Sequence, residues 1–168
     1  MSELRNVGLA ALFALAFLAW GLSSLRPLFR SIASNEAPGW ELKDLDGQLV
    51  KSSDFLGKVV ILDFWATWCA PCKAEIPGFI ALQKQYGDQG LVVIGVSLDD
   101  QGPAVVKRFM ADLQMNYRVV LGDVVLMQAF GGTAIPTTVI INRAGKIVAR
   151  HVGFTPRETF EKEIQPLL

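Results

Sequence analysis

Apolar residues form short, nearly continuous runs separated by polar turns over most of the chain. Residues 59–65 (VVILDFW) and 91–96 (LVVIGV) have strand length and almost no polar position. This pattern is typical of strands that are buried on both faces of a sheet. Shorter strands are predicted at residues 118–121, 137–142 and 146–152. The last two flank a short turn and are therefore expected to pair as a hairpin.

Segments with helical spacing of apolar residues lie between these strands. Residues 103–115 have this spacing, with Pro103 in the first turn, where proline is tolerated. Further helices are predicted at residues 71–85, 124–130 and 155–168. Asp46-Gly47 lies between two alternating runs in residues 41–51, which indicates a β-hairpin. The order of elements predicts an α/β fold with a mixed central sheet flanked by helices.

A different pattern occupies the N-terminus. Residues 7–25 (VGLAALFALAFLAWGLSSL) contain no charged side chain. As a helix rising about 1.5 Å per residue, they would nearly match a hydrocarbon core of about 30 Å. We therefore expect residues 1–35 to comprise an N-terminal transmembrane helix and a linker, and residues 36–168 to form the folded domain. A cleaved signal segment and a buried core helix are the alternatives.

Charge and cysteine content argue against several classes of protein. The chain carries 16 Lys and Arg against 16 Asp and Glu. This balance argues against a nucleic-acid partner, because such a partner needs a basic face. Two cysteines are too few for a disulfide-stapled miniature fold or for a zinc site of four cysteines. One pair of cysteines therefore remains to be explained.

The two cysteines, Cys69 and Cys72, follow a buried strand and open a predicted helix. Free backbone N–H groups and the helix dipole at such a turn stabilise a thiolate, which is the nucleophile of disulfide exchange. Cys69 is therefore the expected attacking thiol, and Cys72 is the thiol that resolves the mixed disulfide. Ala70 and Pro71 between them are expected to tune the redox potential, since proline stiffens the turn.

Two other roles for the cysteine pair are open at this point. A structural disulfide is one, although so short a closed loop adds little stability. Half of a metal site is the other, but it would need further ligands, and the chain has a single histidine, His151. Disulfide exchange is therefore favoured over both.

A resemblance to a known family becomes visible around the cysteines. The segment VILDFWATWCAPCKAEIP at residues 60–77 resembles the thioredoxin superfamily, and more closely the membrane-anchored thiol–disulfide oxidoreductases of the TlpA/ResA type. The resemblance extends from about Ala37 to Leu168 and includes Leu45-Asp46-Gly47, GGTAIPTT at 131–138 and NRAGK at 142–146. It implies a thioredoxin-like fold with an N-terminal β-hairpin extension. It also implies that a redox-active disulfide carries the electrons, without a metal or an organic cofactor.

The resemblance assigns a role to Pro136 as well. In thioredoxin-like proteins a proline at this place follows a cis peptide bond and lies opposite the cysteine pair, although only about 5–6% of X–Pro bonds are cis in general. The residue before it, Ile135, is then implied to pair with an extended substrate chain. Trp68, which precedes the first cysteine, is expected to cover the disulfide and to contact substrate.

Two acidic residues are candidate proton acceptors for the second cysteine. Asp63 lies inside a buried strand, where a carboxylate is unfavourable unless it has a partner or takes up a proton. Its position matches the buried aspartate of thioredoxins. Glu75 matches the acidic position of the TlpA/ResA motif, and a solvated helix face is the alternative for it. Asp99-Asp100 follow a predicted strand and are expected to cap the next helix.

Together these features predict an enzyme, a thiol–disulfide oxidoreductase that exchanges electrons with cysteine pairs of protein substrates outside the cytoplasm. The resemblance implies a reductase, with a role in cytochrome c maturation and a transmembrane electron donor. Arg5 favours a cytoplasmic N-terminus, whereas Arg26 and Arg30 favour the reverse. The redox chemistry favours a single-pass protein of the bacterial cytoplasmic membrane with its domain on the periplasmic side.

Two rival functions would use the same cysteines. A peroxiredoxin-like peroxidase needs a threonine in a TxxC pattern, but that position holds Ala66. A copper- or zinc-binding chaperone would use both sulfur atoms as ligands. Consumption of hydrogen peroxide and titration with metal ions distinguish these rivals from an oxidoreductase.

Overall fold

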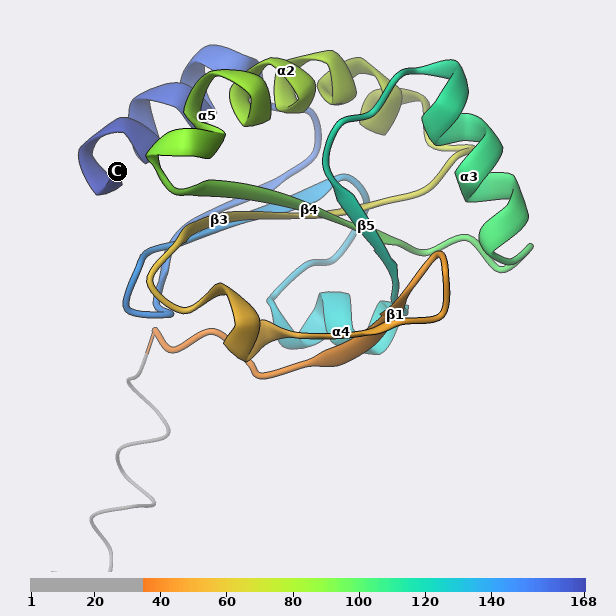
Figure 1. Cartoon of the computed structure of the whole chain (residues 1–168), viewed down its shortest axis with the longest axis horizontal. Coiled ribbons are helices and arrows are strands. Elements are labelled where there is room, and N and C mark those ends of the chain that lie inside the picture. The colour runs from red at the N-terminus through yellow and green to blue at the C-terminus, as the bar shows by residue number, and fades with distance from the viewer. Residues whose placement is uncertain (1–34) are drawn as a thin grey trace, which may run out of the picture. The chain divides into compact units, whose positions relative to one another are not determined.

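Seven strands form one mixed sheet in residues 35–168, the part of the chain that the computed structural model describes (Figure 1). The strands are β1 (Glu41–Asp44), β2 (Leu49–Lys51), β3 (Val59–Trp65), β4 (Leu91–Ser97), β5 (Arg118–Leu121), β6 (Thr137–Ile141) and β7 (Ile147–Val152). Their order across the sheet is β2-β1-β5-β4-β3-β6-β7. β4 is parallel to β3 and β5, and the other neighbouring pairs are antiparallel. The hairpin β1–β2 thus extends the sheet beyond β5.

Helices cover both faces of this sheet. The α-helices are α2 (Ala70–Tyr86), α3 (Pro103–Asp112), α4 (Val124–Ala129) and α5 (Arg157–Ile164). Short 3-10 helices are η1 (Ser52–Phe55), η2 (Gly87–Gln89) and η3 (Gln165–Leu167). Figure 1 shows α2, α3 and α5 above the sheet and α4 below it. Helices on both sides of the sheet bury both faces of its central strands, and all seven residues of β3 are buried.

The alternation of side chains along β3 divides the core into two clusters. Ile61 and Trp65 belong to the cluster that includes residues of α2, whereas Leu62 and Phe64 belong to the cluster on the opposite face. Asp63 lies between Ile61 and Trp65 in the alternation, so its side chain is on the α2 face. This register places a carboxyl group beneath the helix that begins after Cys69.

The predicted α/β architecture with an N-terminal hairpin is confirmed, and the element boundaries differ by a few residues. The helix predicted at 103–115 ends at Asp112. Gln114 has a φ of 53°, a left-handed conformation that no α-helix contains. The helix predicted at 155–168 begins at Arg157 and continues after Ile164 as the 3-10 helix η3.

The predicted transmembrane helix at residues 7–25 lies outside the described residues. Within residues 35–168, no helix is both long enough and apolar enough to cross a membrane.

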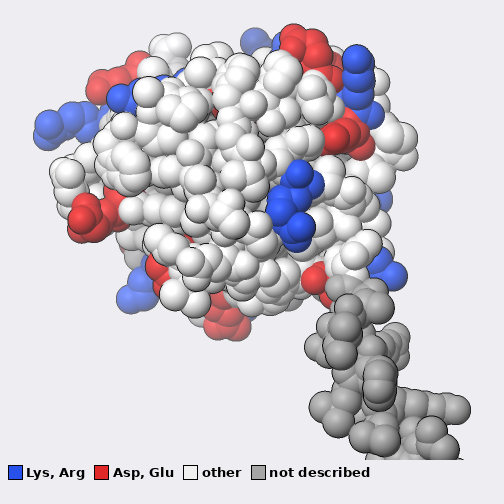
Figure 2. Space-filling model, turned by 180° about the vertical axis from the view of Figure 1, so that it is seen from behind, with Lys and Arg blue, Asp and Glu red and all other residues white. Residues whose placement is uncertain are grey.

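The face turned away from the viewer in Figure 1 is shown in Figure 2. Lysine, arginine and acidic side chains lie mainly toward the margin of this face, and its centre is largely uncharged. Basic and acidic side chains are interspersed on this side of the described residues and form no continuous basic patch there.

Arg143, in the turn between β6 and β7, binds backbone groups of distant segments. Its guanidinium donates hydrogen bonds of 2.5 to 3.2 Å to the carbonyl oxygens of Gly57, Gln89, Leu167 and Leu168. We expect Arg143→Ala to lower the free energy of unfolding by about 2 kcal/mol, because charge-assisted hydrogen bonds are lost and water replaces them only in part. Urea unfolding measures this loss, with the exposed Arg118 of β5 changed to alanine as the control. Equal losses in both variants would contradict the expectation.

Candidate active site

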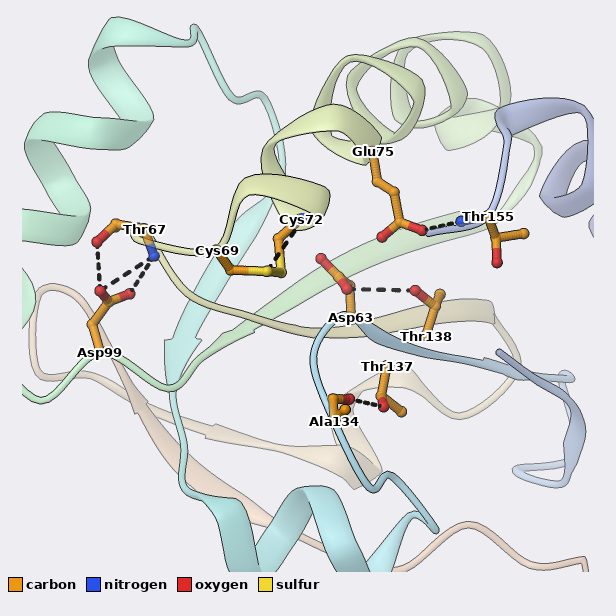
Figure 3. The surroundings of a disulfide bond; sticks show 10 residues. All are labelled: Asp63, Thr67, Cys69, Cys72, Glu75, Asp99, Ala134, Thr137, Thr138 and Thr155. Carbon is orange, nitrogen blue, oxygen red and sulfur yellow. Dashed lines mark hydrogen bonds between the residues drawn. A yellow bond between two sulfur atoms is a disulfide. The ribbon is translucent and has the colours of Figure 1, made fainter. Parts of the chain in front are cut away.

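The cysteine pair lies where β3 leads into α2, and it forms a disulfide (Figure 3). The S–S distance is 2.06 Å and the Cα atoms are 5.3 Å apart. Cys69 is the N-cap of α2, and its sulfur accepts the backbone N–H of Cys72 at 3.3 Å. Cys69 is 5% exposed and Cys72 is 1% exposed. Both are buried, but the N-terminal cysteine is the more accessible one, and its sulfur lies at the helix N-terminus, where backbone N–H groups stabilise a thiolate.

The turn before the cysteines is held by Asp99, which follows β4. Its carboxylate accepts the backbone N–H of Thr67 at 3.0 and 3.2 Å and also the Thr67 hydroxyl. The Ser97 hydroxyl donates to the same carboxylate at 2.9 Å. The predicted helix-capping role of Asp99 is therefore wrong: the N-cap of α3 is Gly102, without a side-chain cap. The parallel pairing of β3 and β4 explains the contact, since it places their carboxyl ends side by side.

Both predicted acidic residues are buried behind the disulfide. Asp63 is fully buried, and the hydroxyl of Thr138 on β6 donates to its Oδ1 at 3.4 Å. Glu75 is only 3% exposed, and the backbone N–H of Thr155 donates to its Oε1 at 2.6 Å. In Figure 3 the two carboxyl groups point into the same space beside Cys72. The alternative of a solvated helix face for Glu75 is wrong, because α2 turns this residue toward the sheet.

Burial changes the proton affinity of these groups. It raises the pKa of Glu75 to about 7, although the N–H of Thr155 favours the carboxylate. Burial also raises the pKa of Asp63 well above its usual range, and the nearby charge of Glu75 adds to the rise. The pKa of Tyr117 rises for the same reasons, burial first and then the two carboxylates. Both shifts favour the protonated carboxyl groups, and Glu75, with a pKa of about 7, exchanges a proton readily near neutral pH.

Several buried polar atoms in this region have no hydrogen-bond partner. Among the described residues, the buried side-chain atoms that lack a hydrogen-bond partner include Asp63 Oδ2, Glu75 Oε2 and the hydroxyl oxygen of Tyr117. Buried polar groups without partners are unusual in folded proteins and often mark functional sites. Sequence reasoning missed Tyr117, Thr138 and Thr155, because nothing local relates them to the cysteines.

The loop before β6 has the predicted backbone conformation. The peptide bond between Ile135 and Pro136 is cis, which confirms the expectation. Ile135 is half-buried and packs against the cluster that contains both cysteines. The backbone N–H of Gly153, after β7, donates to the Pro136 carbonyl at 2.8 Å. Trp68 is 63% exposed beside Cys69, so most of its surface is open to solvent.

Among the described residues, no three histidine, cysteine, aspartate or glutamate side chains converge as candidate metal ligands. The imidazole Nε2 of His151 lies 2.8 Å from the carboxylate of Glu163 and its ring stands edge-on to Phe160.

Comparison with known proteins agrees with this site. The model of the AhpC/TSA family matches residues 33–150. The thiol-disulfide oxidoreductase ResA of Bacillus thuringiensis subsp. konkukian (strain 97-27) is 30% identical over 135 residues, covering 79% of this chain and 76% of the relative.

Two solved structures extend the comparison to the fold. A thiol:disulfide interchange protein of the thioredoxin family from Chlorobium tepidum TLS has a TM-score of 0.71 and 29% identity, over 80% of this chain and 96% of its own. The pneumococcal exposed lipoprotein thioredoxin from Streptococcus pneumoniae strain TIGR4 has a TM-score of 0.66 and 31% identity, over 77% of this chain and 100% of its own.

The fold and the disulfide at the start of α2 define a thioredoxin-like thiol–disulfide oxidoreductase. The predictions of this fold and of an oxidoreductase enzyme are thereby confirmed. The chain belongs to the AhpC/TSA family, and its relatives include ResA.

Proposed function

We propose that the protein reduces disulfides of protein substrates outside the cytoplasm. The thiolate of Cys69 attacks a substrate disulfide, forms a mixed disulfide and releases one substrate sulfur. Cys72 then loses its proton and attacks the sulfur of Cys69, which releases the second substrate sulfur. The substrate gains two electrons and the cysteine pair becomes a disulfide. A transmembrane electron donor returns the two electrons.

The observation that carries this proposal is the difference between the two cysteines. Cys69 caps α2 and is the more exposed, whereas Cys72 is buried one turn along, beside two carboxyl groups. A helix N-terminus stabilises the attacking thiolate. A buried thiol needs a base before it can attack, and Glu75, with its pKa raised to about 7, is suited to take this proton. Asp63 is the second acceptor, for a state in which Glu75 carries no charge, because burial and the charge of Glu75 raise the pKa of Asp63 and favour its protonated form.

Residues around the disulfide complete the proposed site. Trp68, Ile135 and Pro136 bind the substrate chain next to the mixed disulfide. Ala70 and Pro71 tune the redox potential through the geometry of the first turn of α2. The redox centre is the disulfide itself, with no further cofactor.

We also infer that residues 1–35 attach the domain at 36–168 to the bacterial cytoplasmic membrane through the apolar segment 7–25. The S. pneumoniae relative is an exposed lipoprotein, which supports a place outside the cytoplasm. The domain would then face the periplasm and act in cytochrome c maturation or on other exported cysteine pairs.

The rival functions are less well supported by the site. Ala66 has no hydroxyl group, and the hydroxyl of the neighbouring Thr67 donates to Asp99. This site therefore lacks the threonine of the TxxC pattern that a peroxidase needs. A metal-binding chaperone would have to rely on two sulfur ligands, one of them almost fully buried.

The reduction potential of the full chain tests the proposed direction. We expect a value nearer to about −270 mV, as in thioredoxin, than to about −120 mV, as in the oxidant DsbA, because a reductase must be able to donate electrons to its substrates. Equilibration with dithiothreitol buffers, followed by alkylation and mass spectrometry, gives the value. A potential close to that of DsbA would identify an oxidase instead.

A further inference from the structure

Acidic side chains lie on both sides of the disulfide. Figure 3 shows two buried carboxyl groups on the side of Cys72, and Asp99 with Thr67 on the side of Cys69. The proposed mechanism uses the first two as proton acceptors. Asp99 follows β4 and is half-buried, and its carboxylate binds the turn before Cys69 rather than a sulfur atom. Any effect of Asp99 on the reaction must therefore act through that turn.

The contact between Asp99 and this turn is built from several hydrogen bonds. The backbone N–H of Thr67 donates to both carboxylate oxygens, at 3.0 and 3.2 Å, and its hydroxyl donates at 2.5 Å. The carboxylate is itself held by the fully buried Ser97, whose hydroxyl donates to it at 2.9 Å and accepts the backbone N–H of Asp99 at 3.2 Å. The backbone N–H of Leu98 also donates to the Trp65 carbonyl at 2.9 Å. The end of β4 thus fixes the turn after β3 through its backbone and through one side chain.

The fixed turn ends at the N-cap of α2. The backbone N–H of Cys69 donates to the Ala66 carbonyl at 3.1 Å, and the Cys69 sulfur accepts the N–H of Cys72 at 3.3 Å. A helix N-terminus stabilises a thiolate only where the sulfur lies at its free N–H groups. The position of the turn therefore sets how strongly the helix favours the thiolate of Cys69.

We propose that Asp99 is a positioning residue for the attacking thiolate, because its bonds to Thr67 hold the turn that keeps the Cys69 sulfur at the N-terminus of α2. The inference rests on the proposed function of Cys69 and Cys72. It concerns the first step, in which the Cys69 thiolate bonds to one substrate sulfur and the other substrate sulfur leaves as a thiolate. The resolving step, on the other side of the disulfide, does not depend on Asp99.

The charge and the hydrogen bonds of Asp99 have opposite effects on Cys69. A carboxylate charge near a thiol favours the neutral thiol, so loss of the charge alone makes Cys69 more reactive. Loss of the bonds to Thr67 makes Cys69 less reactive, because the sulfur is no longer held at the N-cap. Lys73, in the first turn of α2, is charged as well, and its ammonium lies 5.5 Å from the centroid of the Phe109 ring. This group is unchanged in every variant below, so the sign of the effect identifies its cause.

Alkylation of the reduced full chain with iodoacetamide measures the reactivity of Cys69, whose thiolate displaces iodide. Mass spectrometry locates the modified cysteine. At pH 7 we expect Asp99→Ala to react about fivefold more slowly than wild type, with the midpoint of its pH profile moved to higher pH. Asp99→Asn keeps an oxygen for the N–H of Thr67 and stays within about twofold of wild type. Thr67→Val, which loses only the hydroxyl, reacts about twofold more slowly. An Asp99→Ala variant that reacts as fast as wild type, or faster, overturns the proposal.

Asn142→Ala is the matched control, because Asn142 is another half-buried side chain that holds a turn. Its side-chain oxygen accepts the backbone N–H groups of Ala144 and Lys146, both at 3.0 Å. Since β6 is antiparallel to β3, this turn lies where β3 begins, at the other end of the sheet from the cysteines. We expect Asn142→Ala to be less stable in urea than wild type but to be alkylated at the wild-type rate. If it slows alkylation as much as Asp99→Ala does, lowered stability explains the effect and the proposal fails.

Reaction of the reduced chain with an oxidised two-cysteine peptide separates the two steps. We expect Asp99→Ala to slow formation of the mixed disulfide and to leave the resolving rate unchanged, with its midpoint near pH 7, because Glu75 keeps its surroundings. A wild-type chain that does not reduce the peptide contradicts the proposed function itself. A wild-type chain that reduces it, together with equal slowing of both steps in Asp99→Ala, contradicts only the role of Asp99.

Discussion

Replacement of Cys72 by serine is expected to trap the protein in a mixed disulfide with its substrate. Cys69 at the N-terminus of α2 still attacks, but no second thiol lies beside it to resolve the intermediate. A positioned thiol has a very high effective concentration, so we expect the lifetime of the adduct to rise by a factor of about 10³ or more. Incubation of the reduced full-chain variant with an oxidised two-cysteine peptide, followed by non-reducing mass spectrometry, detects the adduct.

Cys69→Ser is the matched control for this experiment. Cys72 is only 1% exposed, and we expect it to form no adduct when it is the sole cysteine. Trapping by Cys69→Ser and not by Cys72→Ser would reverse the two roles.

Glu75→Gln is expected to slow the resolving step by a factor of about 10² or more near pH 8, because a general base is lost. In wild type the rate should rise with pH around a midpoint near 7, the pKa to which burial raises Glu75. Asp63→Asn should change this step less, since burial and the charge of Glu75 both raise the pKa of Asp63 and make its carboxyl group the less available base. Stopped-flow measurement of resolution between about pH 5 and 9 tests both variants.

The double variant distinguishes the two acceptors. Without the Glu75 charge, the pKa of Asp63 falls, because that charge is one of the causes of its rise. Asp63 should therefore support a residual rate in Glu75→Gln, and the double variant should lose it. A large loss in Asp63→Asn with an unchanged rate in Glu75→Gln would transfer the role of base to Asp63.

The same Glu75→Gln variant has a stability effect with a defined sign. Glu75 has a pKa of about 7 in the folded protein against an ordinary value of 4.5. Between these values the folded state binds a proton that the unfolded state has lost, so wild type loses stability as pH rises through this window. The loss amounts to at most about 3 kcal/mol. Glu75→Gln, which keeps an oxygen for the N–H of Thr155, should gain relative to wild type over that window and match it below about pH 4.5. Urea unfolding of both proteins across this pH range measures the difference.

The arrangement suits the two reactions proposed for one short motif. Cys69 faces the helix N-terminus, where a thiolate is stabilised without a base. Cys72 faces the interior, where a thiol is favoured until a carboxylate takes its proton. In the proposed mechanism this difference in environment sets the order of the two steps, because Cys69, the more accessible of the two buried cysteines, reacts first and Cys72 responds.

Local features of the chain were sufficient to predict the strands and the cysteine pair. The continuous apolar run of β3 and the CxxC sequence that follows it are contiguous in the chain, so their relation needs no long-range information. The family resemblance supplied the cis bond before Pro136, which spacing alone would not have distinguished from an ordinary trans bond.

Glu75 shows which features of the site the sequence can indicate and which require the tertiary structure. Cys72, Glu75, Ile76 and Phe79 are all buried on α2, at helical spacing. This spacing places Glu75 on the side of α2 that faces the sheet, although the sequence analysis had left a solvated helix face open for it. The N–H of Thr155 partly compensates the burial of the Glu75 carboxyl group. Thr155 lies 80 positions further along the chain, so the sequence alone does not indicate this contact.

Only the tertiary structure decided which groups surround the reactive sulfurs. The sheet order brings β4 and β6 to the two sides of β3, which places Asp99 against Thr67 and Thr138 against Asp63. Patterns of polarity report whether a residue is buried, because each side chain responds to its own transfer free energy. They do not report its partner, because a hydrogen bond or a pKa shift depends on atoms that folding brings together from distant parts of the chain.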